Sequence, residues 1–146
     1  MVEKFTTEPV ELPPAGHPFE RSDLLFYGLD HSGASYEARV FMDPRGVGRD
    51  ADSGHRAYVG SFFILGHGGC FGDAGHCDIP GNHDPFDLRP AHQLEPALRI
   101  LTVTGAVRSL LERGVEAAKV TVVAHAAGAG ANDVLAFERV RLATYA

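Results

Sequence analysis

The sequence has few of the features that mark a disulfide-rich scaffold, a membrane protein or a nucleic-acid-binding protein. It holds only two cysteines in 146 residues, too few for a disulfide framework. No apolar run approaches the roughly 18 residues that a membrane helix needs. The formal net charge is −6 and the arginines are scattered along the chain, which argues against a surface for nucleic acid or anionic lipid.

Common catalytic and targeting signatures are missing as well. There is no G-x-S-x-G nucleophile elbow, no P-loop and no G-x-G-x-x-G after a strand. The first residues contain no apolar h-region and no cleavage-like segment. We therefore expect a cytoplasmic protein, or a domain of a longer one. The length and the 45% hydrophobic content are typical of one globular domain.

What is present divides into a proline-rich start and a series of strand-like runs. Residues 1–21 carry four prolines and are predicted to be an extended arm or linker, which leaves 22–146 as the folded domain. Turn residues separate the runs that follow. The predicted strands are 24–29, 36–42, 57–65, 97–103, 119–126 and 134–145.

Two of these runs carry a clear pattern. In 36–42 the apolar residues alternate, so Tyr36 and Val40 should share one face while Glu37 and Arg39 share the other. The run 57–65 is apolar at nearly every position, which predicts a strand covered on both faces.

One short helix is predicted after residue 103. Thr104 is the expected N-cap, and Gly114 stands just past the expected end. Val107, Leu110 and Leu111 recur at helical spacing and should face the core. Together the elements predict an all-β, antiparallel, jelly-roll-like sandwich with one short helix and a long Gly/Cys/His loop.

The loop over residues 65–92 contains both cysteines and four of the eight histidines. Thiolate and imidazole are the ligands that zinc and Cu(I) prefer, and a structural zinc site commonly takes four of them. The spacing fits no zinc finger or ribbon, so two other interpretations stay open: a glycine-rich lid with buried neutral histidines, and a Cys70–Cys77 disulfide. The candidate metal ligands are His67, Cys70, His76, Cys77 and His83.

The histidines outside this loop are predicted to be structural or solvated. His125 alternates with Thr121 and Val123, which favours a hydrogen-bonded histidine in the core or at a sheet edge. His17, His31 and His55 lie in polar turns and are expected to face solvent.

Several segments taken together resemble a known family. The chain from Asp23 to Tyr145 resembles the C-terminal β-sandwich domain attached to bacterial tyrosinase-like and polyphenol-oxidase-like proteins, and the most specific part is G-S-F-x-x-x-G-H with the cysteines after it. The segments that carry the resemblance are SYEARVFM, YVGSFFILGHGGCFGDAGHCDIP, PFDLRPAHQLEPA, LTVTGAVRSLLERG and KVTVVAHAA.

The resemblance implies a non-catalytic accessory role. In that family a separate helical domain carries two copper ions, and this chain has no such helical bundle. The accessory domain shields the copper entrance with a placeholder side chain, and in some relatives its cysteines help to load copper. Carried onto this sequence, the placeholder would be Phe71 or, second, Phe86, and Cys70 with Cys77 would handle copper. The implied partner is a tyrosinase-type catalytic domain or protein.

Two functions from other classes remain open from the sequence. The Cys/His loop could form a copper or zinc site in a stand-alone metalloprotein or metalloenzyme, with one coordination position left for substrate. Alternatively, the chain could be a purely structural sandwich without any ligand.

Overall fold

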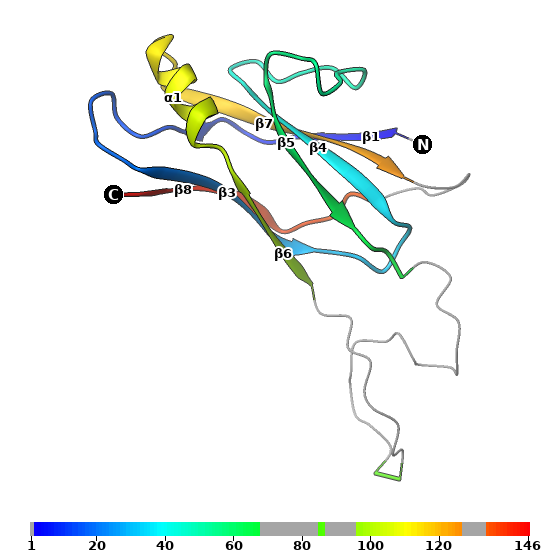
Figure 1. Cartoon of the computed structure of the whole chain (residues 1–146). Coiled ribbons are helices and arrows are strands. Elements are labelled where there is room, and N and C mark those ends of the chain that lie inside the picture. The colour runs from blue at the N-terminus through cyan, green and yellow to red at the C-terminus, as the bar shows by residue number, and fades with distance from the viewer. Residues whose placement is uncertain (1, 68–84, 87–95, 127–133) are drawn as a thin grey trace.

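Figure 1 shows two antiparallel sheets packed against each other, with one helix at one end of the sandwich. The structure, a computed structural model, describes residues 2–67, 85–86, 96–126 and 134–146. The helix is α1 (Thr104–Glu112). The strands are β1 (Val2–Thr6), β2 (Val10–Glu11), β3 (Arg21–Leu29), β4 (Tyr36–Asp43), β5 (Tyr58–Ile64), β6 (Ala97–Thr102), β7 (Ala117–Ala126) and β8 (Arg139–Tyr145).

The two sheets confirm the predicted all-β sandwich. The large sheet has the strand order β1-β7-β4-β5, and β2 also pairs with β7. The small sheet has the order β6-β3-β8. Neighbouring strands in both sheets pair antiparallel. The chain changes sheet between β2 and β3, β3 and β4, β5 and β6, β6 and β7, and β7 and β8, and the segment 65–96 connects β5 of the large sheet to β6 of the small sheet.

The core lies between the sheets and follows from the alternation of side chains along each strand. On β4, Ala38 and Val40 are fully buried, whereas Glu37 and Arg39 lie on the opposite face, as the sequence predicts. On the small sheet, the ring of Phe26 on β3 packs against Phe62 at 5.0 Å between ring centroids and joins the two sheets.

The N-terminal segment is extended, but it is part of the sheet and not a linker. Strand β1 pairs with β7 over five residues, from Val2 opposite His125 to Thr6 opposite Thr121. The prolines that suggested a linker lie outside β1 and β2, so they remove no sheet hydrogen bond. Sequence alone did not reveal the pairing because its partner strand lies more than a hundred residues away.

Three local predictions need correction. The N-cap of α1 is Val103, and the Thr104 hydroxyl instead accepts a hydrogen bond from the Ser22 backbone N–H at 3.0 Å. Strand β5 lies at an edge of the large sheet and is not covered on both faces, because Phe63 is 68% exposed. Strand β8 starts at Arg139 rather than 134, since the backbone N–H groups of residues 134 and 135 bond the Glu3 carboxylate instead of a strand.

The outer face of the large sheet is partly covered by the loop between β4 and β5. Val47 and Ala51 of this loop pack over Phe41 and Val123, and this forms a second, smaller apolar cluster. Within the described part of the chain, no helix has the length and apolar character to cross a bilayer.

Candidate functional site

A tight turn after β3 forms the first wall of the candidate site. The Asp30 carboxylate accepts a hydrogen bond from the Ser32 backbone N–H at 2.8 Å, which is the local bond that favours Asp at such turns. This bond also lowers the pKa of Asp30 below its usual value. The turn therefore presents His31 in a fixed backbone position at the end of the sandwich.

The segment after β5 docks directly on this turn. The Gly66 N–H donates to the Ser35 hydroxyl at 3.0 Å, and the His67 N–H donates to the His31 carbonyl at 2.8 Å. A Cβ atom on residue 66 would lie 2.2 Å from the Gly33 carbonyl oxygen, so only glycine permits this approach. These two hydrogen bonds join the segment after β5 to the turn after β3, and they fix the backbone from which the His67 side chain extends.

These contacts bring two imidazole rings together. The Nδ1 atoms of His31 and His67 are 3.2 Å apart, and the rings meet edge to face with their centroids at 5.0 Å. The His67 Nδ1 also lies 3.4 Å from the His31 carbonyl oxygen. A hydrogen bond between two Nδ1 atoms needs one donor and one acceptor, so at least one of the rings carries a lone pair at this nitrogen.

The separation of the two nitrogens also suits metal ligation. Two imidazole nitrogens bound tetrahedrally to one ion at about 2.05 Å would lie about 3.3 Å apart. The observed 3.2 Å matches this separation, so the two rings could hold one ion after loss of the shared proton. In the ranges that the structure describes, no group of three or more His, Cys, Asp or Glu residues is placed to hold a metal, so the described site supplies two ligands.

The predicted ligand set is only partly placed. His67 lies at this corner, and its partner His31 was expected to be solvated, which was wrong because it is half-buried against His67. The other ligand candidates Cys70, His76, Cys77 and His83, and the first-choice placeholder Phe71, lie outside the described residues. Phe86 is described, and its side chain is 88% exposed.

The sequence held one weak indication of the pair. Both His31 and His67 follow shortly after the end of a predicted strand, so each could lie at an end of the sandwich. Period-2 patterning does not say which strand ends meet, because strand order is set by tertiary packing.

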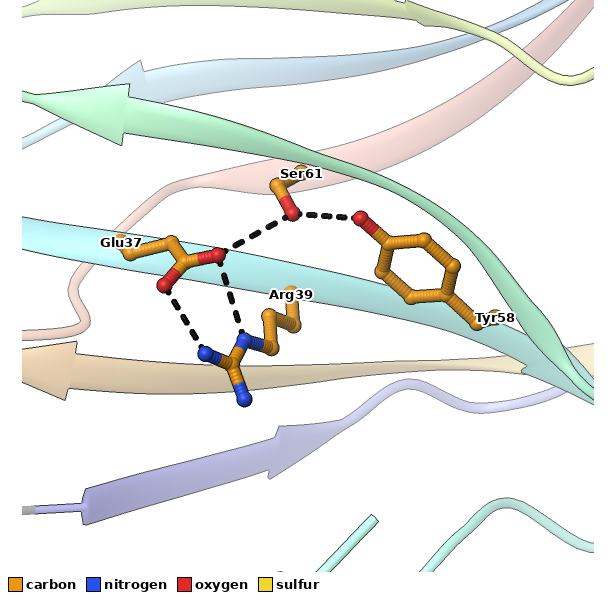
Figure 2. Close-up of polar contacts among 4 residues, drawn as sticks. All are labelled: Glu37, Arg39, Tyr58 and Ser61. Carbon is orange, nitrogen blue, oxygen red and sulfur yellow. Dashed lines mark hydrogen bonds and ion pairs between the residues drawn. The ribbon is translucent and has the colours of Figure 1, made fainter. Parts of the chain in front are cut away.

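A second polar cluster lies on the outer face of the large sheet (Figure 2). The guanidinium of Arg39 donates to both oxygens of Glu37, at 3.2 and 3.1 Å. The Ser61 hydroxyl lies 3.4 Å from the Glu37 carboxylate and 2.7 Å from the Tyr58 hydroxyl. We call these four residues the outer-face cluster.

The outer-face cluster is built as a brace between strands and not as a nucleophile with its base. Hydrogen bonds from Arg39 lower the pKa of Glu37, so this carboxylate stays ionised and paired. A paired carboxylate is a weak base for Ser61, and the cluster includes no imidazole. It therefore links β4 to β5.

His125 lies on the same face, opposite Glu37 in the β4–β7 register. Burial lowers its pKa, and the nearby Arg39 charge lowers the pKa further. Its Nε2 atom is buried and has no hydrogen-bond partner among the described residues. The expected hydrogen-bonded histidine is therefore partly buried, as predicted, but unpartnered at Nε2 within the described chain.

Comparison with known proteins adds no relative: no family model matches the chain, and no curated protein matches it.

Proposed function

We propose that this chain is a metal-handling module that binds Cu(I) or zinc at the corner where His31 and His67 meet. The observation that carries the proposal is the 3.2 Å separation of the two Nδ1 atoms, beside the hydrogen bonds from the His67 N–H to the His31 carbonyl and from the Gly66 N–H to the Ser35 hydroxyl. Cys70 follows His67 by three residues, a reach of at most about 10 Å along the chain. Cys70, His76, Cys77 and His83 are the proposed sources of the remaining ligands.

The finer proposal is an accessory role toward a type-3 copper oxidase, which the family resemblance suggests. An accessory domain that shields a copper entrance needs an apolar side chain exposed at its surface. The 88% exposure of Phe86 meets this requirement. In this proposal the sandwich is a rigid support, the His31–His67 corner handles the ion, and the aromatic side chain enters the oxidase.

Metal binding is tested by titrating the purified chain with Cu(I) and with Zn²⁺ against a competing chelator. We expect His31→Ala and His67→Ala each to weaken binding by at least about tenfold, because each removes one ligand. His17→Ala is the matched control, since His17 is exposed and lies in a distant turn. Equal affinity in all four proteins, or no binding by any of them, would exclude a site at this corner.

Stability gives an independent readout of the same binding. An ion that binds only the folded chain at 100 times its dissociation constant adds about 2.7 kcal/mol to the free energy of unfolding. We expect metal to raise the melting temperature of the wild type but not of His67→Ala. A melting temperature indifferent to metal and chelator would favour a purely structural sandwich.

The accessory role is tested by mixing the chain with the catalytic domain of a type-3 copper oxidase. We expect the chain to change catechol oxidation and Phe86→Ser to weaken that effect. Phe63→Ser is the matched control, because Phe63 is 68% exposed but lies on the sheet. Equal effects of the two variants would refute a specific role of Phe86. Catechol oxidation by the metal-loaded chain alone, lost in His31→Ala, would identify a metalloenzyme instead.

A further inference from the structure

A cavity of about 600 Å³ opens between α1 and the start of β5. This volume lies within the range of small-molecule sites. The cavity is lined by residues 56–59 and by residues of α1 and the strand end before it. His67 follows the other end of β5, so the cavity and the His31–His67 corner lie at opposite ends of one strand, about 20 Å apart.

The charged residues that line this cavity are all positive. Arg56 and Arg113 line it, and no Asp or Glu does, although the chain as a whole has a net charge of −6. The ion pairs found in the described part of the chain, Arg21–Asp23 and Arg39–Glu37, involve neither of these two arginines. Both guanidinium groups are thus available to an anion.

The inner wall of the cavity is apolar. It includes Met42, Val103 and Leu110, each at most 3% exposed and each part of the main core. The first turn of α1 also contributes through Gly105, and this helix has neither a side-chain cap nor an acidic residue in its first turn. A ligand that uses both the arginines and this wall would combine one negative group with an apolar body.

We propose that this cavity binds a small organic carboxylate with an aliphatic or aromatic body. The carboxylate lies between Arg56 and Arg113, where a planar guanidinium can donate two parallel hydrogen bonds to it. The apolar body covers Met42 and Leu110. This site is independent of the proposed metal site, because none of its lining residues belongs to that corner.

Octanoate is the probe, and Met42 is the reporter. The chain holds only two methionines, Met1 and Met42, so methyl-labelled methionine gives two NMR signals. We expect octanoate to shift the Met42 methyl signal in a saturable way at millimolar concentration and to leave Met1 unchanged. 1-Octanol, which has the same body without the charge, should bind at least about tenfold more weakly.

Substitutions locate the anion. We expect Arg56→Gln and Arg113→Gln each to weaken octanoate binding by about tenfold. The matched control Arg49→Gln should stay within about twofold, because Arg49 is exposed but does not line the cavity. All three arginines are at the surface, and an unchanged Met42 chemical shift without ligand verifies that each variant is folded.

Three results would overturn this proposal. They are a Met42 signal that does not respond to octanoate, equal binding of octanoate and octanol, and undiminished binding in the Arg56→Gln/Arg113→Gln double variant. Octanoate binding that persists in His31→Ala separates this site from the metal proposal, so either proposal can fail without the other.

Discussion

Gly60 provides the sharpest test of how β5 of the large sheet packs against the small sheet. Its backbone has φ +148°, a conformation that L-residues with a side chain rarely adopt. It lies at a β-bulge, because Val40 pairs with Gly60 whereas the next residue, Phe41, pairs with Tyr58. A Cβ atom at position 60 would lie 2.8 Å from a methyl group of Leu101 on the opposing sheet.

The cost of Gly60→Ala follows from these two features. Backbone strain of this kind costs about 1–3 kcal/mol. Displacing the flexible Leu101 side chain costs about 0.5–1.5 kcal/mol. The lower entropy of the unfolded alanine chain offsets about 0.4–1 kcal/mol. We therefore expect the free energy of unfolding to fall by about 0.5–4 kcal/mol, which for a chain of this size lowers the melting temperature by about 2–4 °C per kcal/mol.

Urea denaturation measures this change, with Gly48→Ala as control. Gly48 has no positive φ, and no atom lies within 4 Å of its added Cβ, so its substitution should change stability by less than about 1 kcal/mol. In a Leu101→Ala background, Gly60→Ala should cost less, because the steric part is gone and the backbone strain remains. Equal stabilities of Gly60→Ala and Gly48→Ala would refute the bulge argument.

Four further predictions follow from other parts of the structure. Gly66→Ala should weaken metal binding although it removes no ligand, because the added Cβ forces the turn that carries His31 away; metal titration measures this loss. His125→Gln should flatten the pH dependence of stability below about pH 6.5. The pKa of His125 is lowered in the folded chain, so the unfolded chain binds more protons there, and wild-type stability falls as pH decreases through this window; urea denaturation from pH 7.5 to 5 checks the sign. Phe26→Ala should destabilise the fold by about 3–5 kcal/mol, since this fully buried ring contacts both sheets; thermal or urea unfolding measures it. Asp23→Asn should cost about 1–3 kcal/mol at pH 7 by the same assay, because Asp23 is 2% exposed and bonded to Arg21.

Strand patterning predicted most of the sandwich because it depends on one face being buried. The alternation of Tyr36, Ala38, Val40 and Met42 identified both the strand and its core face. The prediction that β5 is covered on both faces, made from its run of apolar residues, was wrong because β5 is an edge strand with Phe63 exposed. The bulge at Gly60 also changes which side chains of β5 share a face. Tyr58 and Ser61, three residues apart, consequently lie on one face and meet at 2.7 Å. A bulge depends on the partner strand, which local sequence does not contain.

The candidate site was predictable only in part for a similar reason. His67 stood out because it lies in a segment dense in cysteine and histidine. His31 has no such neighbours and joins the site only because Gly66 lets two backbone segments approach closely. A glycine at one particular position is weak evidence in a chain with 17 of them. The residue types of the loop indicated metal-binding chemistry, whereas the pairing of His31 with His67 became visible only in the tertiary fold.

The strand order of the large sheet determines when its strands can pair while the chain is being synthesised on the ribosome. Strand β7 lies between β1 and β4, and Thr6 and Thr121, which share a hydrogen bond, are 115 residues apart. At about 5–20 residues per second, β1 waits on the order of 6 to 23 s for its partner to be synthesised. Until then the pairing edges of β1 and β4 are both open, so a nascent chain halted before β7 is the form most exposed to aggregation and to chaperones.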